Sequence, residues 1–383
     1  MAVPHILHVH STFALGGKEA RAVRLMNAFG GAARHSVLSA VPGQLSAREA
    51  LNPSLDVSFP DDAPPLTGAP TPWRLFALAR YARRFDLVLT YNWGAFDMVM
   101  ARRLFAKALG LPPLVHHEDG FNQDETAALN PKRNLYRRLG LGAAHRLVVP
   151  SARLAGLART AWGQKPHRTE RIANGIAVPL YASPPEPELL GLDGERGEIV
   201  IGTVAGLRPV KNLPRLVRAF AAMKTPKTRL VIVGEGPERE RILAEARALG
   251  VEGRVELPGF HSEPWRWIGA FDIFALSSDS EQSPISLLEA MAAGLPAVTT
   301  AVGDIPDMVS AENKPMIVQP GDEAAFTAAL DALAAEQALR YTVGLANRAK
   351  AAVEYDEKAM IARYARLYGE AIGQPRAFVP PEP

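Results

Sequence analysis

The sequence predicts an α/β fold of two doubly wound domains, and three observations support that prediction. The chain has 383 residues, which is long for one domain. Short apolar runs that suit buried parallel strands alternate along it with helical patterns. The clearest strand–loop–helix–strand unit lies within residues 272–307, with strands at 273–276 and 297–300 and a helix at 286–293.

Composition excludes several classes of protein. The chain has no cysteine, which excludes disulfides, thiolate metal sites and a cysteine nucleophile. No apolar run approaches the ~20 residues that span a bilayer. The first ten residues, MAVPHILHVH, lack the basic region and long apolar core of a secretory signal. We therefore expect a cytoplasmic location, with peripheral attachment to the inner membrane face as an option.

Charge is unevenly distributed along the chain. Residues 1–190 hold 22 Lys+Arg and 14 Asp+Glu, a net +8, whereas the remaining residues carry −5. The basic clusters adjoin apolar side chains at 73–84, 102–107 and 132–138. Such helices can contact an anionic membrane or an anionic acceptor, or they can pack on the sheet and leave their arginines in water. No nucleic-acid reader motif accompanies them, so we expect no nucleic-acid partner.

The first candidate site is the loop between the predicted strand at 273–276 and the predicted helix at 286–293. In parallel sheets, ligands bind at the carboxyl ends of the strands. Glu281 lies in this loop, which ends at Ser283, and Glu289 lies on the helix. The first amides of the helix, from Ile285 and Ser286, favour an anion. This arrangement suits a ligand with phosphates between two hydroxyl-bearing sugars. The alternative is a solvated loop carboxylate and an ordinary helix-surface carboxylate.

A long ordered pattern connects these residues to a known family. Glu281 and Glu289 are followed by Ala-Met-Ala-Ala-Gly-Leu-Pro at 290–296 and Val-Gly-Asp-Ile-Pro-Asp at 302–307. This pattern resembles the signature of glycosyltransferase family 4, nucleotide-sugar enzymes of the GT-B fold. The resemblance implies that Glu289 binds the donor ribose and Glu281 the donor sugar. It also implies that the amides of Ile285 and Ser286 hold the diphosphate, near Ser283.

Two further segments resemble donor-binding motifs of the family. Gly16 and Gly17 follow the first predicted strand, where the family has a Gly-Gly-x-Glu segment, and glycines there let the backbone approach phosphate. Lys211 matches a family lysine that binds the donor pyrophosphate. The arginine that usually accompanies it is Gly206 in this chain, and the nearby Arg208 is a candidate substitute. These two cations would offset the charge of the leaving diphosphate.

A histidine pair ends another predicted strand. The family places a histidine-bearing loop here, between acceptor and donor sugar, so His116 or His117 is a candidate catalytic residue. Glu118 or Asp119 is a candidate for orienting acceptor hydroxyls. A metal site on these four residues is an alternative, but consecutive residues rarely converge on one ion. We expect no metal and no cofactor, because the phosphate-binding cations make a divalent ion unnecessary.

The resemblance also implies the domain organisation. We expect two doubly wound domains that face a cleft, an acceptor-side domain over 1–180 and a nucleotide-sugar-binding domain over 181–354, with a helix over 355–373 that returns to the first domain. The composition of residues 374–383 is proline-rich, so we expect a disordered tail there. The segment at the domain crossing departs from the family pattern at Ala173 and Ala177. This departure weakens any role for a crossing carboxylate without affecting the fold.

The resulting functional prediction is retaining transfer from a nucleotide-diphosphate sugar to a hydroxyl of a lipid-linked or cell-surface glycan. A sugar-nucleotide epimerase or a non-catalytic nucleotide-sugar-binding protein remains an alternative. An NAD-linked oxidoreductase is disfavoured, because the Gly234-x-Gly236 segment has Arg239 where the dinucleotide fingerprint needs its third glycine. The sequence does not identify the base, the sugar or the linkage.

Overall fold

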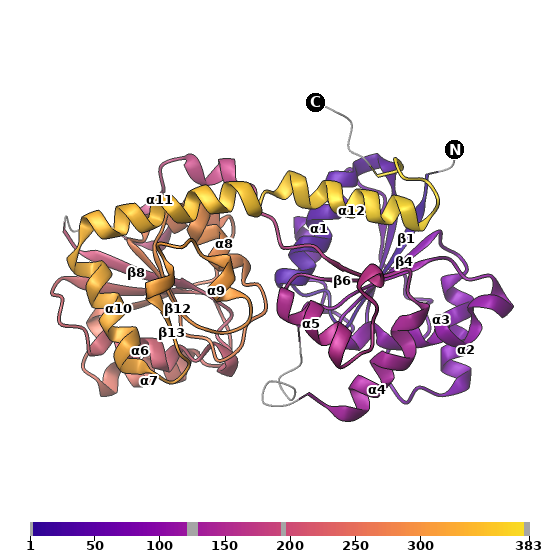
Figure 1. Ribbon diagram of the computed structural model, residues 1–383, viewed down its shortest axis with the longest axis horizontal. Coiled ribbons are helices and arrows are strands. Elements are labelled where there is room, and N and C mark those ends of the chain that lie inside the picture. The colour runs from indigo at the N-terminus through magenta and orange to yellow at the C-terminus, as the bar shows by residue number, and fades with distance from the viewer. Residues whose placement is uncertain (1–2, 121–128, 193–196, 379–383) are drawn as a thin grey trace. The chain divides into compact units, whose positions relative to one another are not determined.

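The computed structural model describes residues 3–120, 129–192 and 197–378 (Figure 1). The chain divides into two compact units: unit 1 comprises Met1–Asn174 with Ala359–Pro383, and unit 2 comprises Gly175–Lys358. Each unit contains a parallel sheet between helices, so the predicted doubly wound α/β fold is confirmed. Of the helices in the described ranges, none is both long and apolar enough to cross a bilayer.

The sheet of unit 1 has the strand order β3-β2-β1-β4-β5-β6-β7 in its described residues, and every neighbouring pair is parallel. The order reverses beside β1, so the carboxyl ends of β1 and β4 flank the switch point where doubly wound sheets bind ligands. The strands are β1 (His5–His10), β2 (Arg34–Ser39), β3 (Val57–Ser58), β4 (Leu87–Tyr91), β5 (Leu114–His117), β6 (Arg146–Val149) and β7 (Thr169–Arg171).

Helices cover both faces of this sheet, because alternate strand residues point to opposite sides. Leu7 and Val88 pack in one core with α2 (Pro72–Ala82), α3 (Phe96–Leu109) and α5 (Ala152–Thr160). Ile6 and Leu89 pack in the other core with α1 (Gly17–Phe29) and α12 (Glu357–Ala371). A further helix, α4 (Pro131–Gly140), contacts α3.

Unit 2 repeats this plan with the strand order β10-β9-β8-β11-β12-β13, again parallel throughout its described residues. Its switch point lies between β8 and β11. The strands are β8 (Ile199–Val204), β9 (Thr228–Val233), β10 (Val255–Gly259), β11 (Ile273–Leu276), β12 (Ala297–Thr300) and β13 (Ile317–Val318).

The core of unit 2 is also layered. Side chains from β8, β9 and β11 pack with α6 (Leu213–Ala221), α7 (Arg239–Ala248) and α10 (Glu323–Ala335). On the opposite side, α8 (Ile285–Ala292) packs against β11, β12 and α11 (Gln337–Glu354). The short helix α9 (Ile305–Met308) follows β12.

The first boundary between the units lies at Asn174–Gly175, before the predicted boundary at residue 180. The backbone of Ile176 explains this position. Its N–H donates to the carbonyl of Tyr355 at 2.9 Å, and its carbonyl accepts from the N–H of Glu357 at 3.0 Å. These bonds attach the segment to the end of α11 in unit 2 before residue 180 is reached.

The C-terminal segment belongs to unit 1. Met360, Tyr364 and Tyr368 on α12 are buried in its core. The expectation of a disordered tail is wrong for residues 374–378, because Phe378 is fully buried and its ring centroid lies 5.4 Å from that of Phe29. Burial of this ring offsets the entropy lost by ordering the segment. Residues 379–383 lie outside the described ranges.

Candidate functional site

Three loops at the carboxyl edge of the unit 2 sheet contain most of the predicted donor-binding residues. They follow β8 (residues 205–212), β11 (residues 277–284) and β12 (residues 301–304), and we call them the donor-side loops. Parallel strands end at one edge of the sheet, so these loops emerge close together, next to the switch point between β8 and β11.

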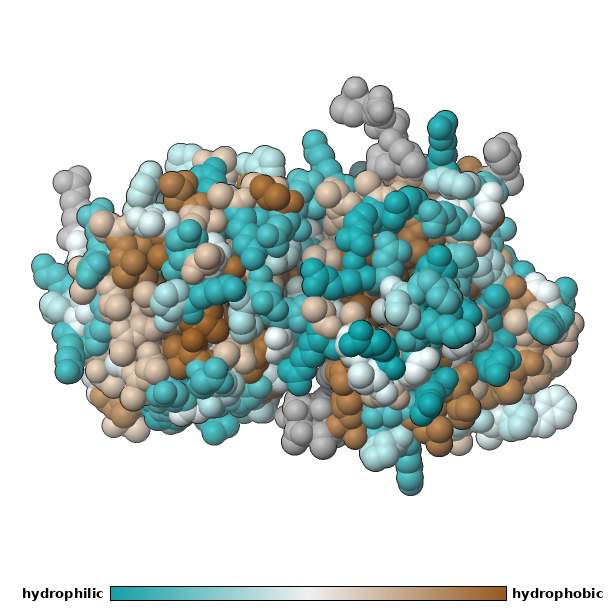
Figure 2. Space-filling model, in the orientation of Figure 1, coloured by the Kyte–Doolittle hydropathy of each residue, from teal (hydrophilic) through white to brown (hydrophobic). Residues whose placement is uncertain are grey.

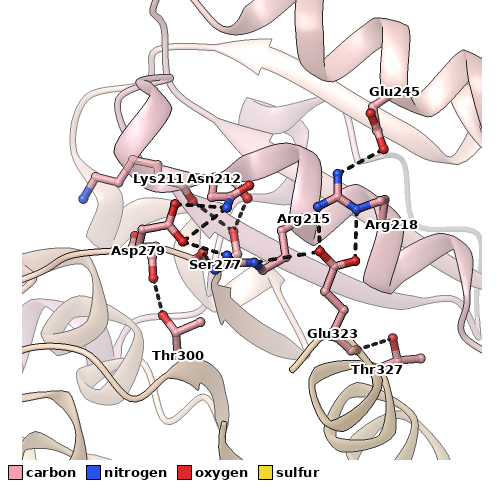
Figure 3. Close-up of polar contacts among 11 residues, drawn as sticks. Lys211, Asn212, Arg215, Arg218, Glu245, Ser277, Asp279, Thr300, Glu323 and Thr327 are labelled. Atoms are coloured by element: carbon pink, nitrogen blue, oxygen red, sulfur yellow. Dashed lines mark hydrogen bonds and ion pairs between the residues drawn. The ribbon is translucent and has the colours of Figure 1, made fainter. Parts of the chain in front are cut away.

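Hydrogen bonds fix the first two of these loops to each other (Figure 3). The N–H of Asp279 donates to the carbonyl of Val210 at 2.8 Å. The hydroxyl of Ser277 donates to the carbonyl of Asn212 at 3.0 Å and to that of Lys211 at 3.1 Å. The segment containing Lys211 is therefore held against the loop containing Glu281.

The third loop supports the Glu281 segment from the other side. Gly303 has a φ of +61°, and a Cβ at this position would lie 2.2 Å from the carbonyl oxygen of Glu281. The N–H of Asp304 donates to the carbonyl of Gln282 at 3.2 Å. The backbones approach so closely that only glycine fits, which gives the Val-Gly segment of the sequence pattern a physical explanation.

Lys211 and Glu281 form an ion pair in these loops. The Lys211 Nζ lies 2.5 Å from Glu281 Oε1, and the Ser278 hydroxyl donates to the same oxygen at 2.7 Å. The two charged side chains are 23% and 10% exposed, so both are accessible although partly screened from water. The structure therefore brings together the cation and the carboxylate that the sequence predicts for the phosphate and the sugar.

Arg208 lies where the resemblance needs a second cation. A Cβ built on Gly206 would lie 3.5 Å from Arg208 Nε, so the guanidinium occupies the space beside the glycine. Arg208 is exposed, and its side chain makes no ion pair with any carboxylate of the described residues. Its charge is available to a ligand at this edge.

The start of α8 completes this group. Pro284 is the N-cap residue and supplies no side-chain cap, so the first amides, from Ile285 and Ser286, are not satisfied by a capping side chain. Such a helix start attracts an anion. Ser283 and Glu289 are half-buried at the start and on the side of this helix.

The sequence reasoning missed a polar network beside these residues. Arg215 forms an ion pair with Asp279 at 2.7 Å and donates to the Ser277 carbonyl at 3.1 Å. The Asn212 amide also donates to Asp279, at 3.0 Å, from a left-handed backbone conformation with φ 45° (Figure 3). The sequence feature that could have indicated this network is Asn212, which lies directly before a helix, where asparagine tolerates a positive φ. This network positions the Lys211 loop.

The predicted glycine pair lies in unit 1, at the carboxyl end of β1. Gly16 is the N-cap of α1, in an extended conformation. A Cβ on Gly16 would lie 3.0 Å from a carboxylate oxygen of Glu19, a buried residue that forms an ion pair with Lys18. Burial raises the pKa of Glu19, although Lys18 acts in the opposite direction. A carboxylate thus already lies at this helix start, and phosphate binding by Gly16 and Gly17 stays a prediction.

His117 is a buried residue of unit 1 with both ring nitrogens engaged. Its Nε2 lies 2.8 Å from the Tyr368 hydroxyl and its Nδ1 3.2 Å from the Thr90 carbonyl oxygen, while Tyr91 stacks on the ring at 4.6 Å. Burial, reinforced by the charge of Arg21, lowers the pKa of His117 to about 3. The ring is therefore neutral near pH 7, and the arrangement leaves neither nitrogen for a sugar hydroxyl.

His116 points to the opposite face of the sheet, as adjacent strand residues must. Its Nδ1 lies 2.8 Å from the Thr90 hydroxyl, and its Nε2 lies 3.5 Å from a carboxylate oxygen of Glu118. All of these groups are buried. The structure thus places both histidines in the interior of unit 1 and does not support the prediction that one of them contacts the donor sugar. No metal-binding group of three His, Asp or Glu side chains occurs within the described ranges.

Asp119 follows β5 and forms a bidentate ion pair with Arg21 of α1. The two oxygen–nitrogen distances are 2.6 and 2.9 Å, and the same guanidinium donates to the Asn174 side chain at 3.1 Å. Burial alone would raise the pKa of Asp119, but the charge and hydrogen bonds of Arg21 outweigh burial and lower it. The carboxylate is thus committed to an internal contact, which argues against the predicted contact with acceptor hydroxyls.

Comparison with known proteins identifies the class of this fold and site. The family described as Glycosyl transferases group 1 matches residues 193–351, and the family described as Glycosyltransferase Family 4 matches residues 15–178. Together these matches cover most of both units. They define the chain as a glycosyltransferase of the two-domain α/β class.

Individual proteins agree with that class. The chain is 27% identical to an N-acetyl-alpha-D-glucosaminyl L-malate synthase from Bacillus anthracis over 46% of each chain. It is 28% identical to a D-inositol 3-phosphate glycosyltransferase from Kribbella flavida, over 71% of this chain and 67% of that protein. The fold of Anabaena HepE, solved with UDP and glucose, is similar with a TM-score of 0.74 and 19% identity, covering 94% of this chain and 98% of that one.

The chain belongs to glycosyltransferase family 4 and has the GT-B fold. The match spans just under half the length of the Bacillus anthracis relative. Neither of these two relatives is named as an epimerase.

Proposed function

We propose that this protein transfers a sugar from a nucleotide-diphosphate sugar to an acceptor hydroxyl, with retention at the anomeric carbon. The observation that carries the proposal is the Lys211–Glu281 pair, 2.5 Å apart, in loops beside the start of α8. Lysine, carboxylate and helix start are the groups that a diphosphate next to a sugar requires.

The ion pair suggests how the donor enters. In the absence of ligand, Glu281 neutralises Lys211. A diphosphate carries more negative charge than one carboxylate, so it competes for Lys211 and releases Glu281 to accept hydrogen bonds from sugar hydroxyls. Arg208 adds a second cation, and the half-buried Glu289 binds the ribose hydroxyls.

The transfer breaks the bond between the anomeric carbon and the diphosphate oxygen and forms one to the acceptor oxygen. The acceptor proton passes to the departing phosphate oxygen on the same face of the sugar, which gives retention without a protein nucleophile. Lys211 and Arg208 stabilise the charge that develops on the leaving group. This role is one that a metal ion fills in other enzymes, so we propose that none is needed.

We further propose an anionic acceptor, such as a lipid-linked or cell-surface glycan. The N-terminal half of the chain carries a net +8, which would attract such a molecule. The names of the two relatives contain L-malate and inositol 3-phosphate, both small anions. These names support a negatively charged acceptor.

Thermal unfolding with UDP, GDP, ADP, CMP and NAD tests the donor site. A ligand at about 100 times its dissociation constant stabilises the native state by roughly 2.7 kcal/mol, which corresponds to several degrees. We expect one nucleoside diphosphate to raise the Tm of the wild type but not of Glu289→Ala. The control Glu240→Ala removes an exposed glutamate from α7 and should respond as the wild type does. Stabilisation by NAD alone, or by no diphosphate, would contradict the proposal.

A peripheral membrane contact is the second part of the proposal. The helices α2, α3 and α4 contact one another in sequence order and hold one carboxylate, Asp97, which already pairs with Arg74. Figure 2 shows hydrophobic and hydrophilic residues intermixed where Figure 1 places these helices. We call their exposed side chains the basic helix face: Trp73, Arg80, Arg103, Leu104, Lys107, Lys132, Leu135, Arg138 and Leu139.

Sedimentation with lipid vesicles tests this contact. Each basic residue near an anionic surface contributes about 1 kcal/mol at low salt. We expect the protein to sediment with phosphatidylglycerol vesicles but not with phosphatidylcholine vesicles, and the Lys132→Glu/Arg138→Glu variant to lose most of this binding. If wild-type protein stays in solution with anionic vesicles even at low salt, the membrane contact is excluded.

A further inference from the structure

A cavity of about 380 Å³ opens at the amino-terminal edge of the unit 1 sheet. Pro113 precedes β5, Arg146 begins β6, and Arg168 precedes β7, and all three line the cavity. Gly16 and Asp119, by contrast, follow the carboxyl ends of β1 and β5. The cavity is therefore at the sheet edge opposite to the one where ligands of this fold class bind, and it has no part in the proposed transfer.

The lining of this cavity is unusually cationic. Five of its residues are arginine or histidine, and the others are proline and alanine, so no carboxylate lines it. The five are Arg102, His145, Arg146, His167 and Arg168. Clustered cations without a counter-charge repel one another, and an anion in the cavity would remove that repulsion.

The arginine side chains are held in place by backbone carbonyls and by no carboxylate of the described residues. Arg102 donates to the carbonyls of Ala143 and Leu111, each at 3.0 Å, and Arg168 donates to that of Ala144 at 2.6 Å. The carbonyls orient the guanidinium groups without neutralising them. Preorganised, uncompensated guanidinium groups are what a phosphate-binding site requires.

His145 adds an unsatisfied ring nitrogen. Its Nε2 is buried and has no hydrogen-bond partner. Burial is the largest effect on the pKa of His145 and lowers it, and the positive charges of Arg146, Arg168 and Arg102 act in the same direction. The carboxylate of Glu370 on α12 acts in the opposite direction and raises it. Glu370 itself lies 3.8 Å from Arg366, so its charge is shared with a cation outside the cavity.

We propose that this cavity is an anion site for a ligand that carries a phosphate group. Arg102, Arg146 and Arg168 supply the positive charge, and His145, whose protonated form a bound anion would favour, lines the same cavity. The volume lies at the lower end of small-molecule sites, which span roughly 300–1,000 Å³, so it suits a free phosphate or a small phosphomonoester. A phospholipid headgroup offers the same chemistry, and the experiment distinguishes the two sources.

Calorimetric titration of the full chain with inorganic phosphate tests the site. The Lys211→Met background removes a cation of the donor-side loops, so that binding there does not contribute. On it, we expect Arg146→Gln to weaken phosphate binding about tenfold, the usual effect of losing one charge-assisted hydrogen bond. Arg159→Gln removes an exposed arginine of α5 and is the matched control, expected to bind as its parent does. No binding to the parent, or equal losses in both variants, would overturn the proposal.

Two further arms sharpen the result. Arg146 makes its hydrogen bond to the adjacent His145 carbonyl, at 3.0 Å, so the variant should keep the Tm of its parent, and a large drop would assign this arginine to folding instead. Vesicles with phosphatidic acid that compete with inorganic phosphate would identify a headgroup as the source. Phosphate binding that these vesicles leave unchanged would identify a soluble ligand.

A pH series with sulfate gives an independent readout, because sulfate does not titrate in this range. A bound anion favours the protonated form of His145, so the site takes up a proton on binding. Because burial lowers the pKa of His145, sulfate affinity should rise as the pH falls into the acidic range below the usual histidine pKa of about 6.5. His145→Gln should abolish that rise, and a variant with an unchanged pH profile would remove His145 from the site.

Discussion

Replacing Lys211 with methionine is expected to lower kcat/KM for sugar transfer about 100- to 1,000-fold, as removal of one preorganised donor to developing charge does elsewhere. Methionine keeps the apolar stem of lysine and removes the ammonium group 2.5 Å from Glu281. The variant loses the cation that offsets the departing diphosphate, and it leaves the carboxylate of Glu281 unopposed where the phosphate must bind.

The same variant should fold nearly as well as the wild type. The ion pair is partly exposed, and such pairs contribute about 0–1 kcal/mol to stability. Lys314→Met removes an exposed lysine of the same unit and is the matched control. Activity measured as nucleotide release, together with the Tm of each variant, separates the two effects. Turnover of Lys211→Met equal to that of the control would remove Lys211 from the phosphate site.

The donor-side loops could be predicted because their chemistry is contiguous in the sequence. Glu281, Glu289 and the start of α8 lie within one strand–loop–helix unit, and the chain direction alone puts that loop at the carboxyl edge of the sheet. The contact between Lys211 and Glu281 was not predicted, because it joins loops from two strands. The family resemblance assigned the two residues to neighbouring parts of one donor, and the adjacency of β8 and β11 explains why their side chains meet.

The histidine pair shows where the same reasoning fails. Its place at the end of an apolar strand was correct, but the alternation of strand side chains sends His116 toward α3 and His117 toward α12. The partners that occupy these rings, such as Tyr368, come from the far end of the chain. Local patterns contain no information about such partners, so burial of the histidines was not predictable.

Other misses have the same origin. The strand β2, Arg34–Ser39, has only two apolar residues, yet its four central residues are buried because it lies between β3 and β1 in the sheet. Phe378 lies three residues after Pro375, in a segment whose composition indicates disorder, yet it packs beside Phe29. In both cases tertiary packing overrides local propensity.

Replacing Arg21 with methionine is expected to destabilise unit 1 by about 3–5 kcal/mol, the usual cost of breaking a buried ion pair by removing one partner. The two side chains are 3% and 13% exposed, and Asp119 accepts two hydrogen bonds from the guanidinium. The guanidinium also lies 5.7 Å from the centre of the Tyr364 ring, so this one side chain connects α1, the loop after β5 and α12. Urea unfolding measures the loss, and hydrogen exchange of the β1 and β5 amides locates it in unit 1.

The pH dependence distinguishes an unpaired charge from a simple packing defect. In the wild type the pKa of Asp119 is lowered, so the ion pair stabilises the fold above the normal carboxyl pKa and loses this effect as the pH falls. Without Arg21, burial is left to raise the pKa of Asp119, so the destabilisation caused by Arg21→Met should shrink as the pH falls and Asp119 becomes protonated.

The double variant Arg21→Met/Asp119→Asn should recover much of the lost stability at neutral pH, because it removes the buried charge. Arg159→Met, an exposed change in the same unit, should behave as the wild type. A penalty for Arg21→Met that is independent of pH and not relieved in the double variant would mean that the arginine acts through packing alone.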